Sequence, residues 1–296
     1  MSDISSQIKL ANGLGMPRLG LGTWGLSGRA AVAPAVEAAL EAGYRSFDTA
    51  SVYGNEAELG ASLRESGLAR GELFVASKVW NSDQGPGLTR QACLGSLERL
   101  GLQFLDLLLL HWPVALRSLQ AWEEMERLLS EGLVRAIGVS NFGKGHLARL
   151  LAACGTRPMV NQIELHPYLS QEPLAGYCRD QGIVVEAYSP LARGQVRKNQ
   201  FFQKLARRHG RSVAQVVLRW HFQGGRALIP KSATPQRVRE NGAIFDFVLS
   251  PEEMAGIGRQ NQDRSVLRPR FELDGEGWVM GDGGPAVPLG HPVRPE

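Results

Sequence analysis

The chain has 296 residues, of which 43% are hydrophobic, so it is long enough to bury a sizeable core. Its formal net charge is only +4 and its lysines and arginines are scattered, which argues against a nucleic-acid-binding surface. The longest apolar run is far too short to cross a bilayer, and the amino terminus lacks the pattern of a secretory signal. We therefore expect a cytoplasmic protein that binds neither nucleic acid nor membranes.

The three cysteines, Cys93, Cys154 and Cys178, are widely spaced and lie within or beside predicted helices. This pattern indicates reduced thiols rather than a disulfide framework or a metal site. The densest basic patch, at 207–211, is interpreted as a solvated helix end because no aromatic residues are interleaved with it.

Two short alternating runs, residues 8–10 and 17–19, flank an Asn12-Gly13 pair, which predicts an amino-terminal β-hairpin. The next run, GLGTW at 20–24, reads as a glycine-rich strand. Its glycines suggest that backbone or a ligand approaches it closely.

From Leu19 onward, short apolar runs alternate with amphipathic helical patterns. Near-continuous apolar strands separated by such helices indicate a parallel sheet that is covered on its outer face. Eight runs favour a closed (β/α)8 TIM barrel over an open doubly wound sheet. No G-x-G-x-x-G opens a helix after an early strand, which also argues against a Rossmann domain. The predicted strands cover residues 19–24, 44–47, 73–78, 104–110, 133–139, 159–163, 183–187 and 226–229.

We expect one barrel domain over residues 1–273, followed by a tail at 274–296 that is rich in glycine and proline. Late helices are predicted to begin at Ser212, which forms a capping box with Gln215, and at Ser250, which precedes Pro251. The tail is expected to lack regular structure. Trp278 is the one residue that favours its docking over the barrel mouth.

Polar residues gather where the predicted strands stop. Asp48 ends the second strand, Tyr53 lies in the loop after it, Lys78 ends the third strand and His111 follows the fourth. Alone, Lys78 reads equally well as a snorkelling barrel-end lysine and His111 as a core histidine. Together they place an acid, a phenol, an ammonium and an imidazole at the barrel face where such folds keep their active sites.

This set suits proton donation to a carbonyl oxygen while a cofactor delivers hydride. A tyrosine is normally a weak acid, and a nearby lysine cation is expected to lower the pKa of Tyr53. Asp48 would hold Lys78 in place, and a neutral His111 would orient the carbonyl oxygen.

A series of short motifs runs from the hairpin to about Leu249. They are GLGTW at 20–24, GYRSFDTA at 43–50, YGNE at 53–56, SK at 77–78, HWP at 111–113, GVSNF at 138–142, NQ at 161–162, AYSPL at 187–191 and IPKS at 229–232. With these motifs in this order, the sequence resembles the aldo-keto reductase family, in particular its short bacterial carbonyl, aldehyde or diketogluconate reductases. The resemblance implies a (β/α)8 barrel and a tetrad of Asp48, Tyr53, Lys78 and His111 with Tyr53 as proton donor.

The resemblance also implies that the cofactor is NADPH. Ser140, Asn141 and Gln162 would hold its carboxamide, and Tyr188 would stack on the nicotinamide. Lys231, Ser232 and Arg237, helped by Thr234, would bind the 2′-phosphate. Two cations and a hydroxyl suit a dianionic phosphate. Glu240 and Asn241 would lie near the adenine. Further cofactor contacts fall at Gly22, Thr23, Asp48, Ser189 and Leu191. The plainer alternatives are strand-end caps for the amides and ordinary surface charges for Lys231 and Arg237.

The substrate is expected to be a small carbonyl compound beside His111, Trp24, Trp80 and Trp112, and more weakly Trp278. Only residues 114–117 separate Pro113 from the next helix, so that substrate loop is short. We expect a monomer. A nicotinamide-sensing regulatory barrel with little turnover is the main alternative. A metal-dependent isomerase or hydrolase is disfavoured, because no cluster of histidines or carboxylates accompanies the strand ends.

Overall fold

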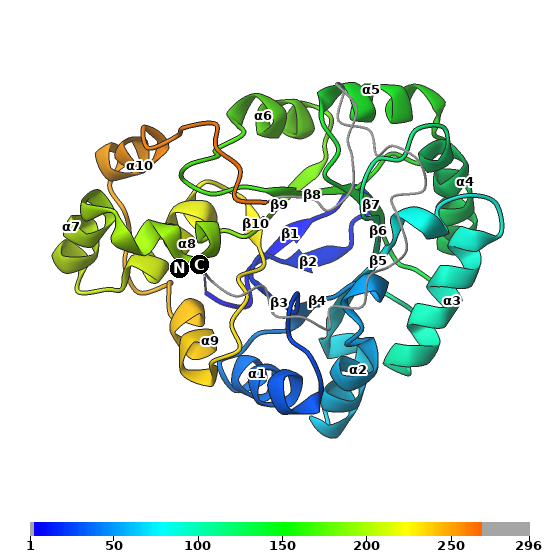
Figure 1. The fold of residues 1–296 in the computed structure, drawn as a ribbon, viewed down its shortest axis with the longest axis horizontal. Coiled ribbons are helices and arrows are strands. Elements are labelled where there is room, and N and C mark those ends of the chain that lie inside the picture. Colours follow the sequence, from blue (N-terminus) through cyan, green and yellow to red (C-terminus); the bar gives the residue numbers. More distant parts are fainter. Residues whose placement is uncertain (1–2, 268–296) are drawn as a thin grey trace.

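The structure, a computed structural model, describes residues 3–267 and contains the predicted barrel (Figure 1). Eight parallel strands pair in sequence order, each with the next along the chain. A parallel bridge between Leu19 and Leu228 joins the last strand to the first and closes the barrel. The strands are β3 (Gly20–Gly22), β4 (Ser46–Asp48), β5 (Phe74–Val79), β6 (Leu107–Leu110), β7 (Ile137–Ser140), β8 (Val160–Glu164), β9 (Val184–Tyr188) and β10 (Ala227–Leu228).

Helices surround the strands (Figure 1). A large apolar cluster of buried residues includes side chains from both the strands and the helices. The capping box predicted at Ser212 and the helix start predicted at Ser250 are confirmed, and each serine side chain accepts from the backbone three residues on. The helices are α1 (Arg29–Glu41), α2 (Glu56–Glu65), α3 (Leu88–Leu100), α4 (Arg117–Ser130), α5 (Lys144–Ala153), α6 (Glu172–Asp180), α7 (Gln200–His209), α8 (Val213–Gln223), α9 (Pro235–Gly242) and α10 (Pro251–Gly258).

The predicted hairpin is confirmed as the antiparallel pair β1 (Gln7–Lys9) and β2 (Gly15–Pro17). Leu10 and Met16 from this hairpin belong to a second apolar cluster with residues at the starts of the barrel strands, such as Phe74 and Leu107. The hairpin therefore closes the amino-terminal end of the barrel. The opposite end, where the strands finish, is left for the site.

The glycines of β3 do allow a close backbone approach. A Cβ on Gly22 would come within 2.9 Å of the backbone oxygen of Ile229, and one on Gly20 within 2.9 Å of the Ser46 hydroxyl oxygen. Such contacts are shorter than side chains tolerate, so β3 packs tightly against its neighbours at the seam that closes the barrel.

Several boundaries differ from the sequence predictions. β6 and β7 begin three to four residues later than predicted, at Leu107 and Ile137. Helix α7, for which no bounds were predicted, ends at His209 within the basic patch, and Arg208 and His209 pair with Glu253 of α10 at 2.9 Å. The tail from 274 and Trp278 lie outside the described residues. Among residues 3–267, no helix is long and apolar enough to cross a membrane.

Candidate active site

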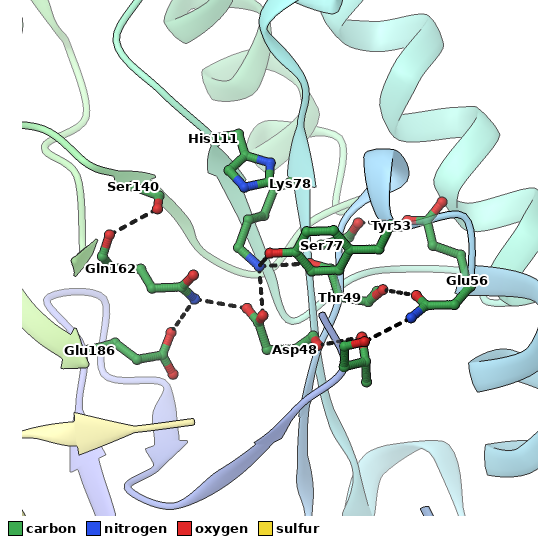
Figure 2. A network of polar contacts seen from close by, with 12 residues as sticks. Asp48, Thr49, Tyr53, Glu56, Ser77, Lys78, His111, Ser140, Gln162 and Glu186 are labelled. Atoms are coloured by element: carbon green, nitrogen blue, oxygen red, sulfur yellow. Dashed lines mark hydrogen bonds and ion pairs between the residues drawn. The ribbon is translucent and has the colours of Figure 1, made fainter. Parts of the chain in front are cut away.

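The four residues of the predicted tetrad come together at the carboxyl ends of three neighbouring strands (Figure 2). Asp48 is the last residue of β4, Lys78 lies in β5 and His111 directly follows β6. Tyr53 ends a short 3₁₀ turn, Ser51–Tyr53, in the loop between β4 and α2. In Figure 2 the phenol oxygen of Tyr53 points toward the ammonium of Lys78.

The ammonium of Lys78 is the centre of this arrangement. It donates to Asp48 Oδ1 at 2.6 Å, to the backbone oxygen of Thr49 at 2.8 Å and to the hydroxyl of Tyr53 at 3.4 Å. An ammonium has three protons, so these partners account for all of them. The Lys78 side chain has no exposed surface, and only 5% of the Asp48 side chain is exposed.

The surroundings of Lys78 keep it charged. Burial is the largest single effect and lowers the pKa of Lys78, but the Asp48 charge and hydrogen bond, together with Tyr53 and Glu186, outweigh it and leave this pKa above its ordinary value. The pKa of Tyr53 is also raised, because desolvation outweighs the opposing Lys78 charge. The prediction that Lys78 gives Tyr53 a lowered pKa is therefore wrong in its net direction. The phenol holds its proton, and the cation beside it favours the phenolate that would form on proton loss.

His111 is buried between two aromatic rings. Its imidazole makes edge contacts with Tyr53 at 5.7 Å and Trp80 at 5.1 Å between ring centroids. Burial, reinforced by the Lys78 charge, lowers its pKa well below the ordinary value, so the ring is neutral at pH 7. A neutral imidazole offers one N–H donor and one acceptor.

Asn55 and Thr23 hold the loops around the tetrad, and sequence reasoning gave Asn55 no role. The buried Asn55 amide donates to the backbone oxygens of Thr23 and Leu26 at 2.9 Å and accepts from the Thr49 hydroxyl at 2.7 Å. The Thr23 hydroxyl donates to the Asp48 backbone oxygen at 2.9 Å. Asn55 thus joins the end of β3 to the end of β4. An asparagine two residues after Tyr53 was the only signal in the sequence.

The four residues expected to hold the nicotinamide end of the cofactor come from neighbouring strands: Ser140 ends β7 and Asn141 follows it, Gln162 lies in β8, and Tyr188 ends β9. Tyr188 is partly exposed, and its hydroxyl donates to Asn141 Oδ1 at 2.7 Å. Asn141 in turn donates to the His111 backbone oxygen at 2.9 Å and to the Ser140 hydroxyl at 3.1 Å. Both amide protons of Asn141 are therefore used within the protein. The Gln162 amide donates to Asp48 Oδ2 at 2.8 Å.

Other predicted cofactor-binding residues lie at the carboxyl end of β3 and in the loop after β9. Gly22 ends β3, and Ser189 and Leu191 follow β9 in a loop where Ser189 has a φ of 47°. Arg193, further along this loop, lies over the ring of Trp24 at 5.0 Å, so the loops after β9 and β3 meet here.

The residues expected to bind a phosphate follow β10. The Ser232 hydroxyl accepts from the Thr234 backbone N–H at 3.0 Å, just before α9. Lys231 and Arg237 are exposed, although desolvation still lowers the pKa of Lys231. In the same helix, Glu240 is partly exposed and Asn241 is buried.

A pocket of about 240 Å³ opens beside Asn141 and Tyr188, and its other lining residues include Trp112, Leu169 and Leu267. Trp80 lies against His111, and Trp24 is 40% exposed at the end of β3. A larger hollow of about 690 Å³ runs along α3 and contains none of the predicted site residues. In residues 3–267, no three His, Cys, Asp or Glu side chains are placed to bind a metal ion.

A family model for the aldo/keto reductase family matches residues 18–261. The chain belongs to this family. It is 47% identical over 265 residues to a glyoxal reductase of Bacillus subtilis (strain 168), an alignment that covers 90% of this chain and 96% of the relative. The resemblance seen in the sequence motifs is confirmed.

Solved aldo-keto reductases share the fold. An enzyme from a Medee basin deep-sea metagenome library superposes with a TM-score of 0.87 at 40% identity, covering 90% of this chain and 99% of that one. A Bombyx mori aldo-keto reductase, solved in complex with NADP, gives a TM-score of 0.85 at 36% identity, covering 90% of this chain and 96% of the other. This chain is an oxidoreductase of the aldo/keto type with a (β/α)8 barrel.

Proposed function

We propose that this aldo/keto reductase uses NADPH to reduce aldehydes or ketones to alcohols, with Tyr53 as the proton donor. The observation that supports this most directly is the Lys78 ammonium, held at 2.6 Å from Asp48 and 3.4 Å from the Tyr53 hydroxyl. A phenol with a raised pKa keeps its proton at neutral pH. The adjacent cation then stabilises the phenolate once that proton has left.

Each residue of the tetrad has a separate task in this proposal. NADPH, when bound, supplies the hydride that adds to the carbonyl carbon. Tyr53 gives its proton to the carbonyl oxygen, which completes the alcohol. The neutral His111 donates a hydrogen bond that orients this oxygen beside Tyr53. Asp48 acts through Lys78, because it touches the ammonium and not the phenol.

The chemistry of the side chains suits the cofactor. Gln162 gives its amide nitrogen to carboxylates inside the barrel, so its carbonyl oxygen remains to accept from a carboxamide. Lys231 and Arg237 are exposed cations on either side of the start of α9, where backbone N–H groups and a positive helix end also favour phosphate. Two cations beside the Ser232 hydroxyl favour NADPH over NADH.

The substrate is proposed to be a small aldehyde or ketone. Aromatic side chains at the mouth and a pocket of about 240 Å³ suit a compact molecule with an apolar face. The relative named glyoxal reductase supports small dicarbonyls as the first compounds to test. Three features stay predictions: that the protein is cytoplasmic, that it is a monomer, and that residues 1–273 form one barrel domain.

The test is a Tyr53→Phe variant, which removes the hydroxyl and keeps the ring. We expect NADPH-dependent reduction of glyoxal or methylglyoxal to fall by about 10²- to 10⁴-fold, the usual contribution of a general acid. The Kd for NADPH, measured from cofactor fluorescence, should stay within about twofold of the native value. A twofold change corresponds to less than about 0.5 kcal/mol of binding free energy.

Tyr177→Phe in α6 is the matched control, because Tyr177 packs beside Lys144 outside the tetrad. It should turn over like the native enzyme. Undiminished reduction by Tyr53→Phe would end the proposed role of this residue. Tight NADPH binding with no turnover of glyoxal, methylglyoxal, keto-sugars or aromatic aldehydes would instead favour a nicotinamide-sensing barrel.

A further inference from the structure

The buried acid Glu186 has no part in the function proposed above. It lies in the middle of β9, its residue is only 3% exposed, and its partner position on β10 is the apolar Ala227. On the other side of β9, Gln162 of β8 stands at the paired position. The Gln162 amide nitrogen donates to Glu186 Oε2 at 2.7 Å.

The same amide nitrogen also donates to Asp48, so that Gln162 bridges two carboxylates inside the barrel (Figure 2). An amide nitrogen has two protons, and the two carboxylates take both. Rotating the amide by half a turn would point its carbonyl oxygen at two anions. The two acids therefore fix which end of the Gln162 amide faces into the barrel and which faces the mouth.

We propose that Glu186 is a positioning residue that keeps the carbonyl oxygen of Gln162 turned toward the barrel mouth, where it accepts from the carboxamide of bound NADPH. This inference rests on the proposed function, because the bound cofactor is what supplies the hydrogen-bond donor. Glu186 touches neither cofactor nor substrate in this scheme. It acts through Gln162 alone.

Protonation of Glu186 should weaken this constraint. Burial raises the pKa of Glu186 to about 7, and repulsion from Asp48 adds to it, while the Gln162 hydrogen bond and the Lys78 charge oppose it. These are the polar and charged groups that face Glu186: Gln162 from β8, Asp48 from β4 and Lys78 from β5. A protonated carboxyl can donate as well as accept, so it tolerates either orientation of the Gln162 amide.

The consequence has a definite sign. Above pH 7 Glu186 is ionised and both acids fix the amide, whereas below pH 7 Glu186 is protonated and only Asp48 still opposes rotation of the amide. Protonation of Glu186 should therefore lower the affinity for NADPH as the pH is lowered through 7. The 2′-phosphate also takes up a proton, near pH 6 as other phosphate monoesters do. Variants must accordingly be compared with the native protein at the same pH, which cancels the phosphate contribution.

The decisive variant is Glu186→Gln, which keeps the shape and a hydrogen bond but resembles the protonated acid. The measurement is the Kd for NADPH at pH 8 and pH 6, from the change in cofactor fluorescence without substrate. At pH 8 the variant's Kd should exceed the native value by roughly three- to tenfold, the size expected for loss of one hydrogen bond between neutral groups, here the Gln162 oxygen and the carboxamide. At pH 6 the two values should converge.

A purely structural role for Glu186 predicts a ratio of the two Kd values that does not change with pH. That result, or equal Kd values at pH 8, would overturn the inference. Glu124→Gln is the matched control, because Glu124 is a buried acid on α4 that pairs with Arg127 outside the barrel. Its Kd ratio should be one at both pH values. Thermal unfolding of each variant checks that the fold is intact.

Failure of this inference can be told apart from failure of the proposed function. Native protein that binds NADPH and reduces carbonyls, with a pH-independent Kd ratio, overturns the role of Glu186 alone. Native protein that neither binds NADPH nor reduces any carbonyl overturns the proposed function and this inference with it.

Discussion

Replacing Lys78 with methionine is the most informative change to this barrel, because it tests stability and chemistry together. Methionine keeps much of the length of the side chain but removes the charge. Asp48 Oδ1 then loses its partner at 2.6 Å, and the Thr49 backbone oxygen loses one at 2.8 Å. The Asp48 carboxylate retains only the Gln162 amide, at 2.8 Å from Oδ2.

The size of the effect follows from the burial of the pair. Breaking a buried ion pair by removing one partner costs about 3–5 kcal/mol, because the other charge is left uncompensated. The surviving Gln162 hydrogen bond places Lys78→Met at the lower end, at about 3 kcal/mol. For a domain of this size each kcal/mol shifts Tm by roughly 2–4 °C, so Tm should fall by about 6–12 °C.

The assay is urea and thermal unfolding of the native protein, both single variants and the double variant Lys78→Met with Asp48→Asn. The asparagine removes the stranded charge and its oxygen still accepts from Gln162. The double variant should therefore recover most of the stability lost by Lys78→Met, while carbonyl reduction remains lost. A Lys78→Met protein as stable as the native one, or a double variant less stable than Lys78→Met, would refute the reasoning.

Three further predictions concern the rest of the site. Arg237→Ala should raise the KM for NADPH about tenfold and leave the KM for NADH nearly unchanged, as loss of one charged phosphate contact predicts. Arg239→Ala is the control, because Arg239 lies on the same helix as Arg237 but pairs with Glu41 of α1; equal effects of Arg237→Ala on both cofactors would contradict the phosphate contact. Asn55→Ala should lower the free energy of unfolding by about 2–3 kcal/mol, because it leaves two buried carbonyl oxygens without their hydrogen-bond donor. A decrease below about 0.5 kcal/mol in urea unfolding, as is usual for a surface substitution, would show that Asn55 does not hold the ends of β3 and β4 together. The raised pKa of Lys78 means that its contribution to stability is complete below about pH 10 and is lost as pH rises through its folded-state value; native protein should therefore lose more stability than Lys78→Met between pH 9 and pH 11, and parallel losses would contradict this linkage.

Much of this architecture could be predicted because each strand and helix has a local signal. Eight apolar runs marked the barrel, Asn12-Gly13 marked the hairpin, and Ser212 and Ser250 marked helix starts. Parallel strands place their ends at one face. For this reason Asp48, Tyr53, Lys78 and His111 could be assigned to a common site before any contact was known.

Properties that depend on how deeply a side chain is buried, or on contacts across the barrel, could not be predicted from the sequence. The net direction of the Tyr53 pKa depends on how strongly desolvation competes with Lys78, which spacing along the chain does not reveal. Glu186 lies on β9, and its coupling to Asp48 on β4 exists only because the sheet closes. An acid inside a predicted apolar strand was its only sign in the sequence.

The bridge between Leu19 and Leu228 also has a consequence for how the chain acquires its shape during synthesis. β3 is among the first strands to be made, and its partner β10 is the last, so the barrel cannot close until nearly all of the described chain exists. Until then β3 and β10 each keep a free edge, and contacts this distant in sequence form slowly. Lys231 follows β10 and faces Gly25 in the loop after β3. The proposed phosphate site therefore straddles this seam, and a barrel that has not closed has strands and helices but no complete rim for the cofactor.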